Sequence, residues 1–353
     1  MDDLEGGFMK NTKIWTIKDE HDEQLIEAAE LLRNGGTVAF PTETVYGLGA
    51  NALIEEAVEG IYTAKGRPSD NPLIVHIANL DLLDGLVERA PLQDLLIDAF
   101  WPGALTLIFK SKGTVAKRVS PGLDTQSIRM PNHPVARKLI ELSGVPVAAP
   151  SANLSGKPSP TVGKHVVEDL KGRVDGIVVY DQSKVGVEST ILDLTSDPPM
   201  LLRPGGITVE QIENVIGSIA IDPALEKKMS DTIQPKAPGM KYTHYSPEAD
   251  VYVIQGDLSH VKEKIQSLYD TYDLKVGIMC SDESKAYYKA DCVLSLGSRD
   301  SLSEVASNLF MTLREFDEIG VDIVLAEGYD TVGMGKAIMN RLNKAAGFKI
   351  IKV

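Results

Sequence analysis

Two fixed cations and several turn-forming residues occupy the segment from Lys65 to His76, which reads KGRPSDNPLIVH. Its glycine and two prolines impose a backbone that neither a helix nor a strand can adopt, so the loop has a defined shape. Lys65 offers a point charge to a phosphate, and Arg67 can donate to two oxygens at once. The segment is therefore typical of an anion-binding loop, although a Lys-x-Arg pair alone is more often only a solvated surface.

Two other polar segments follow stretches that read as buried strands. Residues 41–51, PTETVYGLGAN, lack the third glycine of a dinucleotide fingerprint and are interpreted as a polar turn. The hydroxyl of Thr44 there either caps a helix or faces a ligand. Residues 148–159 present Ser151 and Asn153 on a Pro- and Gly-shaped loop, and they suit either phosphate oxygens or solvent.

Arg129 and Arg203 stand at apolar strand-like segments. An arginine in such a position seldom lacks a partner, so Arg129 is expected to meet a ligand or a buried carboxylate. Arg203 follows two leucines and is a third candidate anion contact. A polar turn at residues 186–190, GVEST, also ends an apolar stretch.

Common covalent and metal motifs are absent from the sequence. It has no Gly-x-Ser-x-Gly elbow and no His-Glu-x-x-His pair, and Cys280 and Cys292 are too far apart for a zinc site. Residues 333–337, GMGKA, depart from a P-loop and are interpreted as the start of a helix. We therefore expect neither covalent nor zinc catalysis, and no resident metal.

Length and charge limit the possible partners. A chain of 353 residues favours two domains, and a net charge of −14 opposes binding to nucleic acid or an anionic membrane. Small phosphorylated ligands in a locally basic cleft fit this balance better. The acidic first residues do not resemble a signal peptide and no run reaches membrane-spanning length, so a cytoplasmic protein is expected.

Helical and strand patterns alternate along the chain, which predicts an α/β fold with a twisted mixed sheet and flanking helices, followed by a smaller Rossmann-like α/β domain. The expected domains are residues 1–217 and 248–353, joined by a linker at 218–247. Helices are expected at 21–34, 55–64, 92–100, 134–143, 301–318 and 335–346, and strands at 37–40, 73–77, 105–109, 127–130, 145–149, 176–180, 189–194, 251–254, 276–279 and 323–327. The linker contains Lys241, Tyr242, His244 and Tyr245, and it is either an active-site lid or a spacer.

Taken together, four motifs in order closely resemble the long, two-domain form of the YrdC-like threonylcarbamoyl-AMP synthases. They are the PTET of residues 41–44, the Lys65-x-Arg67 pair, the Ser151-x-Asn153 pair and the KYTHY of residues 241–245. The resemblance implies that ATP, L-threonine and bicarbonate give threonylcarbamoyl-AMP and pyrophosphate. It also implies Mg²⁺ bound with ATP and a separate transferase that moves the group to tRNA.

The resemblance assigns roles to individual residues. Lys65 and Arg67 would carry catalysis. The residues expected to face ATP are Arg67, Asn71, Thr125, Ser151, Asn153, Ser159, Arg203, Lys241 and Tyr245. Those expected to face threonine are Thr44, His76, Arg129, Ala149, Ser189 and Thr190.

Two rival functions remain at this point. The carbamoyl transfer of hydrogenase maturation uses a similar domain, but its proteins also carry cysteine-rich zinc motifs that this chain lacks. A non-catalytic RNA-binding module would use a concave basic face, and the acidic net charge argues against it. Direct tRNA binding is therefore not expected.

Overall fold

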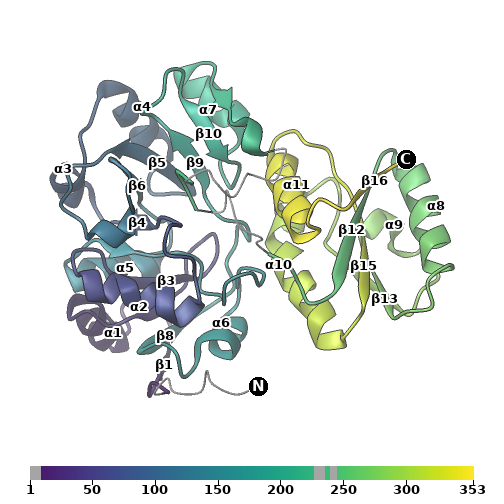
Figure 1. Cartoon of the computed structure of the whole chain (residues 1–353), viewed down its shortest axis with the longest axis horizontal. Coiled ribbons are helices and arrows are strands. Elements are labelled where there is room, and N and C mark those ends of the chain that lie inside the picture. Colours follow the sequence, from purple (N-terminus) through teal and green to yellow (C-terminus); the bar gives the residue numbers. More distant parts are fainter. Residues whose placement is uncertain (1–8, 226–234, 239–244) are drawn as a thin grey trace.

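The computed structural model describes residues 9–225, 235–238 and 245–353, and it contains two α/β domains that lie side by side (Figure 1). Each domain has its own sheet, and the described residues contribute eleven strands to the first and five to the second. The predicted α/β class is confirmed. Among the described residues no helix is both long and apolar enough to cross a membrane.

The first sheet is mixed, as predicted. Its strands lie in the order β1-β8-β2-β3-β7-β4-β6-β5-β9-β10-β11. Neighbours β4 and β6 are parallel, whereas β2 and β3 are antiparallel. The bounds in sequence order are Lys13–Thr16 (β1), Val38–Phe40 (β2), Gly47–Asn51 (β3), Ile74–His76 (β4), Leu105–Lys110 (β5), Thr125–Arg129 (β6), Val147–Ala148 (β7), Gly176–Val179 (β8), Thr190–Asp193 (β9), Met200–Arg203 (β10) and Ala220–Ile221 (β11).

Helices cover this sheet with apolar stripes that have helical spacing. In α1 the buried side chains are Leu25, Ala28, Ala29 and Leu32, which lie on one face of the helix. The helices are Gln24–Arg33 (α1), Glu55–Lys65 (α2), Leu83–Leu86 (α3), Pro91–Phe100 (α4), Pro134–Ser143 (α5), Gly163–Leu170 (α6) and Val209–Ile216 (α7). Helix α2 ends at Gly66, whose φ of 62° is left-handed. Lys65 is thus held by a helix, and the loop of Arg67 starts immediately after it.

One prediction for this domain is wrong in part. The sequence suggested a polar turn over residues 41–51, but residues 47–51 form strand β3. Two of its five residues are glycines, so the strand lacks the alternation of side chains by which a strand is recognised. A side chain at Gly49 would lie 2.7 Å from Phe40 and 2.8 Å from Val147, so glycine is needed for this close packing.

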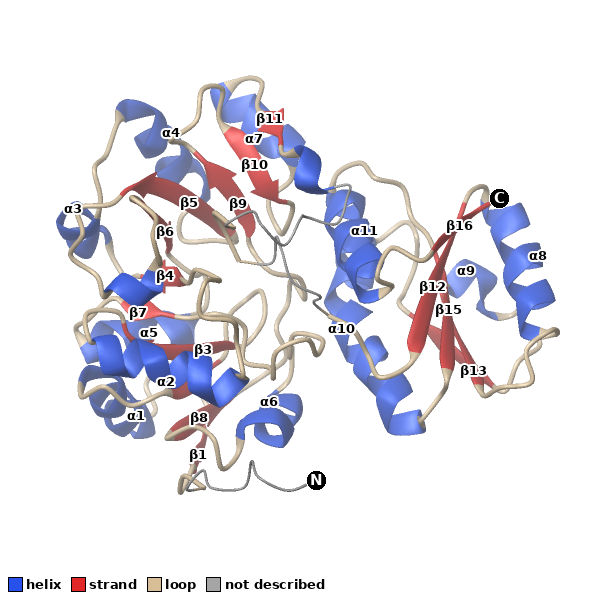
Figure 2. Cartoon of the chain, viewed as in Figure 1, coloured by secondary structure: helices blue, strands red, loops and turns tan. Residues whose placement is uncertain are grey.

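The second sheet is parallel throughout and has the order β14-β13-β15-β12-β16. Its strands are Asp250–Gln255 (β12), Val276–Cys280 (β13), Cys292–Ser295 (β14), Ile323–Glu327 (β15) and Ile350–Lys352 (β16). Its helices are Leu258–Tyr269 (α8), Asp282–Lys285 (α9), Leu302–Ile319 (α10) and Met334–Ala345 (α11). Helices α10 and α11 lie on the side that faces the first domain (Figure 2).

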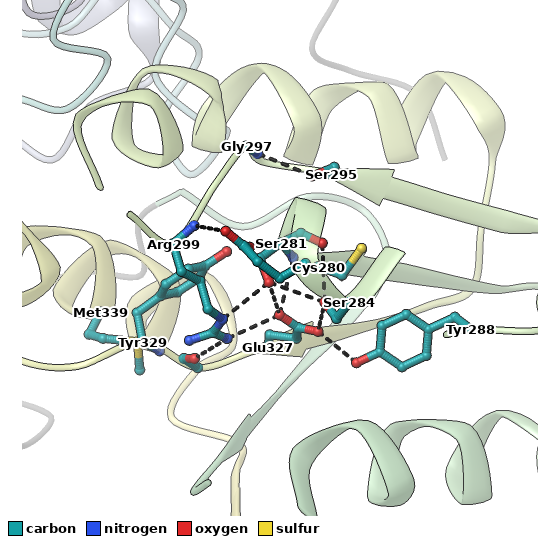
Figure 3. A network of polar contacts seen from close by, with 12 residues as sticks. Cys280, Ser281, Ser284, Tyr288, Ser295, Gly297, Arg299, Glu327, Tyr329 and Met339 are labelled. Atoms are coloured by element: carbon teal, nitrogen blue, oxygen red, sulfur yellow. Dashed lines mark hydrogen bonds and ion pairs between the residues drawn. The ribbon is translucent and has the colours of Figure 1, made fainter. Parts of the chain in front are cut away.

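A buried carboxylate closes the carboxyl edge of the second sheet (Figure 3). Glu327, at the end of β15, accepts hydrogen bonds from the hydroxyls of Ser281 at 2.8 Å and Tyr288 at 2.7 Å. Arg299 forms an ion pair with it at 3.0 Å and lies over the ring of Tyr329. Parallel sheets often bind ligands at this edge. Here side chains of the protein itself occupy both oxygens of Glu327.

Candidate active site

One cavity in the first domain contains most of the residues that the sequence singled out. It encloses about 710 Å³ of space free of protein atoms, part of it open to solvent. Its walls come from the polar segments that follow β2, α2, β7 and β8, together with strand ends and with Pro238 and Tyr245 of the linker. The predicted residues that line it are Thr44, Lys65, Arg67, His76, Arg129, Ala149, Ser151, Asn153, Ser189, Arg203 and Tyr245.

Lys65 links the end of α2 to the loop of residues 148–159, here called the serine-rich loop. Its ammonium donates to the main-chain oxygens of Ser151 and Asn153, each at 2.5 Å. The hydroxyl of Ser151 in turn donates to the side-chain oxygen of Asn153 at 2.6 Å. Burial, with the charge of Arg67 nearby, holds the pKa of Lys65 well below its ordinary value. An anion bound in the cavity would favour the charged form.

Arg67 is shaped by its own loop. Its guanidinium donates to the main-chain oxygens of Asn71 at 3.3 Å and Pro72 at 3.0 Å. These two hydrogen bonds use the Nε and Nη2 edge of the guanidinium. The Arg67 side chain also lines the cavity. The prolines of the loop therefore serve to place carbonyl oxygens that orient this cation.

Arg129, on β6, forms an ion pair with a buried carboxylate, which is one of the two partners expected from the sequence. Its guanidinium lies 2.7 Å from Glu43 and donates to the hydroxyl of Thr44 at 2.9 Å and to the main-chain oxygen of Gly103 at 3.1 Å. All three nitrogens are engaged, but a guanidinium carries five N–H groups. Donors therefore remain for a carboxylate in the cavity.

His76, on β4, lies in parallel register with Arg129. Burial and the charge of that arginine lower the pKa of His76 to about 3. The imidazole is therefore neutral at physiological pH. It can offer a hydrogen bond to a substrate without adding positive charge.

Arg203, at the end of β10, also lines the cavity. It donates to the main-chain oxygen of Ser189 at 3.0 Å and to its hydroxyl at 3.1 Å. Burial lowers the pKa of Arg203 to about 10, which leaves it a cation at neutral pH. A third donor reaches the main-chain oxygen of Pro238, in the linker, at 3.4 Å.

Glu188 is a cavity residue to which the sequence analysis assigned no role. The polar turn at 186–190 was the available signal, but nothing in it indicated the partners of the carboxylate. One oxygen accepts from Ser159 at 2.6 Å and the other from Arg341, in the second domain, at 2.7 Å. Burial acts to raise the pKa of Glu188, but Arg341 and Arg203 lower it to about 2. Glu188 is thus a fixed anion in the cavity wall.

Four predicted residues do not line the cavity. Asn71 is buried and its main-chain oxygen accepts from Tyr62 and Arg67. Thr125 is half-buried at the start of β6. Ser159 touches Glu188, and Thr190 donates to the main-chain oxygen of Ile207. Lys241, Tyr242 and His244 fall outside the described residues.

A separate group of possible metal ligands lies where α6 meets α10. His165, Glu168 and Glu318 bring one ligand atom each within 4.8 Å of one another. The ammonium of Lys164 lies 2.7 Å from Glu318 and 3.7 Å from Glu168. One lysine thus pairs with both carboxylates, and we interpret the group as a charged contact between the domains.

Comparisons with known proteins identify the family of this chain. Residues 30–205 match the family model described as Telomere recombination, and residues 207–347 match the one described as Threonylcarbamoyl-AMP synthase, C-terminal domain. The threonylcarbamoyl-AMP synthase of Pyrococcus abyssi is 50% identical over 97% of this chain and 100% of its own. That of Bacillus subtilis is 51% identical over 97% of this chain and 99% of its own.

A solved structure shows the same arrangement of both domains. The crystal structure of P. abyssi Sua5 complexed with L-threonine aligns with a TM-score of 0.90 at 50% identity, covering 97% of this chain and 98% of the other. The Escherichia coli YciO structure covers only 55% of this chain, with a TM-score of 0.50 at 25% identity. Because near-complete relatives share half of its residues, the chain belongs to the threonylcarbamoyl-AMP synthase family, in its two-domain form.

Proposed function

We propose that the cavity binds ATP and L-threonine together and, with bicarbonate, converts them into threonylcarbamoyl-AMP and pyrophosphate. The proposal rests on one observation: a single cavity is lined both by a group of cations and by a separate hydroxyl and guanidinium pair. Lys65, Arg67 and Arg203 supply positive charge for a triphosphate. Thr44 and Arg129 supply a hydroxyl and a guanidinium for a small hydroxy amino acid.

The reaction needs placement and charge neutralisation. Bicarbonate and the threonine amine form a carbamate as a C–N bond forms and water leaves. A carbamate oxygen then attacks the α-phosphorus of ATP, and the bond to the pyrophosphate leaving group breaks. Because the carbamate is already nucleophilic, the protein needs no nucleophile of its own. Lys65 and Arg67 would stabilise the charge that develops on the phosphates.

Threonine recognition fits the second wall. The remaining N–H groups of Arg129 can bind the substrate carboxylate, and Thr44 lies 2.9 Å from the same guanidinium. A hydroxyl–hydroxyl contact in a buried site discriminates strongly against analogues that lack the group. Neutral His76 adds a donor or an acceptor beside them.

Magnesium would enter with ATP rather than occupy a site built by the protein. Among the described residues that line the cavity, Glu188 is the carboxylate, and both of its oxygens already accept hydrogen bonds. Mg²⁺ commonly binds through substrate phosphates and waters, which suits such a wall. The ion would supply charge neutralisation on the phosphates.

The product would pass to a separate transferase that modifies tRNA. With a net charge of −14, this chain is poorly suited to bind tRNA itself. A cytoplasmic location follows from that role in tRNA modification. Catalysis is favoured over the RNA-binding alternative because the near-complete relatives are named as synthases.

The test is pyrophosphate release with each component omitted in turn. We expect release to require ATP, Mg²⁺, threonine and bicarbonate, and ¹³C-bicarbonate to label the adenylate detected by mass spectrometry. Release that does not depend on threonine would reject the proposal. A salt-dependent gel shift with tRNA, together with no turnover, would instead favour the RNA-binding module.

A further inference from the structure

Helix α11 of the second domain carries an arginine that contacts Glu188, a residue of the cavity wall in the first domain. Arg341 is fully buried and donates to Glu188 at 2.7 Å and to the main-chain oxygen of Pro204 at 2.9 Å. Asn340, next to it on α11, accepts a further hydrogen bond at 2.9 Å. The guanidinium is thus fixed on both sides of the contact between domains. Arg341 does not itself line the cavity.

Without this arginine, the carboxylate of Glu188 would lose its ion-pair partner beside the ATP phosphates and keep the charge of Arg203 nearby. Its other oxygen holds Ser159, a residue expected on the ATP side. Two further cations interact electrostatically with this ion pair. Arg203 acts on Glu188, and Lys344 lies close enough to interact with both members of the pair. Burial and the two arginines lower the pKa of Lys344 to about 7, so the charge of Arg341 is the permanent one from this helix. Neutralisation of Glu188 by the second domain therefore keeps this wall attractive to an anion.

The second domain also fixes an aromatic residue of the same wall. Tyr245, at the end of the linker, stacks on Phe310 of α10 with ring centroids 5.0 Å apart. The guanidinium of Arg341 lies 5.6 Å from the centroid of the Tyr245 ring. Ser246 then donates from its main chain to Gly156, in the serine-rich loop, at 2.9 Å. These contacts join α10, α11 and the loop that faces ATP.

We infer that Arg341 is a positioning residue for ATP: it neutralises and orients Glu188 and helps to hold Tyr245, so that the second domain completes the ATP side of a cavity built by the first. The inference rests on the proposed function, because ATP is the anion concerned. It gives the second domain a role in the reaction itself, even though its own sheet edge is closed by the Glu327 contacts.

The experiment compares Arg341→Gln, Glu188→Gln and the double variant in the pyrophosphate assay. Arg341→Gln leaves the carboxylate of Glu188 in the wall without its ion-pair partner. The KM for ATP should therefore rise about tenfold or more, while the KM for threonine should change less than about threefold. Glu188→Gln removes the negative charge as well. The double variant should therefore have a lower KM for ATP than Arg341→Gln alone, by about fivefold or more. A merely structural contact predicts little change in the KM for ATP in any of the three variants, because its loss would appear in thermal stability instead.

Arg314→Gln is the matched control. Arg314 is another buried arginine between the domains, and it pairs with Asp169 at 2.7 Å. The variant Arg314→Gln should have lower thermal stability than wild type and a KM for ATP within about threefold of the wild-type value. A rise equal to that of Arg341→Gln would reduce the effect to general docking and overturn the inference.

The outcomes separate the inference from the proposed function. Wild-type enzyme without threonine-dependent turnover would reject the function itself. Active wild-type enzyme with an unchanged KM for ATP in Arg341→Gln would reject only the role of Arg341. If Arg341→Gln does not fold, Arg341→Lys and the double variant decide. Arg341→Lys keeps the charge and should show a smaller rise in KM for ATP than the double variant, and the reverse order would overturn the inference.

Discussion

Arg129 and Glu43 form a buried ion pair, with 2.7 Å between a guanidinium nitrogen and a carboxylate oxygen. The carboxylate also accepts from the main chain of Asn132 at 2.9 Å, so it is fixed from two sides. The pair holds the arginine in the cavity and leaves part of its donor set unused. Its position is therefore set before any substrate binds.

We expect Arg129→Lys to impair threonine binding. A lysine has one nitrogen and cannot reach Glu43, Thr44 and a substrate carboxylate in the same geometry. The KM for threonine should rise about tenfold or more, and the KM for ATP should change much less. Initial rates of pyrophosphate release measure both. Arg137→Lys, at an exposed position on α5, is the control and should behave as wild type. Equal losses for both substrates would contradict a role in threonine recognition.

Lys65→Met should reduce turnover far more than stability. The substitution removes a phosphate contact and the donor that holds the carbonyls of Ser151 and Asn153. It also removes a buried ammonium, which offsets part of the lost hydrogen bonding. We expect kcat/KM for ATP to fall about a hundredfold. Lys112→Met, at an exposed lysine, is the control. A wild-type rate in Lys65→Met would remove this lysine from the mechanism.

Much of the fold could be predicted because its elements are regular. Residues 134–143 and 323–327 form a helix and a strand with the predicted bounds. Apolar periodicity and flanking Gly and Pro mark such elements clearly. Strand β3 could not be recognised, since its glycines remove the side-chain pattern and are needed only because other strands pack against them.

The site was predictable where single segments carry it and unpredictable where distant segments meet. The loops that contain Lys65 and Ser151 can be recognised in the sequence by their Gly, Pro and small polar residues. The role of Glu188 depends on Arg341, which is 153 residues away along the chain. The sequence around either residue does not indicate such a pairing, because the burial and the charge compensation arise only when the two domains are in contact.

The stability of the protein should fall as the pH drops below about 6.5, and His76 should contribute to this fall. An unperturbed histidine, as in the unfolded chain, has a pKa of 6.5, whereas the pKa of His76 in the folded protein is about 3. Between these values the unfolded chain binds the extra proton, so the free energy of unfolding decreases by up to about 1.4 kcal/mol per pH unit. His133 and Glu188 also have lowered pKa values and add to the slope.

His76→Asn isolates that contribution. The variant keeps a neutral polar side chain but has nothing to protonate, so its free energy of unfolding should fall less steeply between pH 6.5 and pH 4. Denaturant unfolding at several pH values measures the slopes. His260→Asn, at an exposed histidine of α8, should keep the wild-type slope. Identical slopes for His76→Asn and wild type would show that His76 is not buried in its neutral form.

Glu327→Ala should weaken the second domain while sparing substrate binding. The carboxylate holds two serine hydroxyls, the phenol of Tyr288 and the guanidinium of Arg299 at the edge of the second sheet. Removing it deprives all of these donors of a shared acceptor and leaves the half-buried guanidinium without its counter-ion, which should lower the free energy of unfolding by about 3–5 kcal/mol. Glu327→Gln retains one acceptor oxygen and should cost less. Denaturant unfolding and the pyrophosphate assay test the two effects separately. We expect folded Glu327→Ala to keep its KM for ATP within about threefold, because this network does not touch the contact between Arg341 and Glu188. A large rise in that KM with little loss of stability would instead place a ligand site at Glu327.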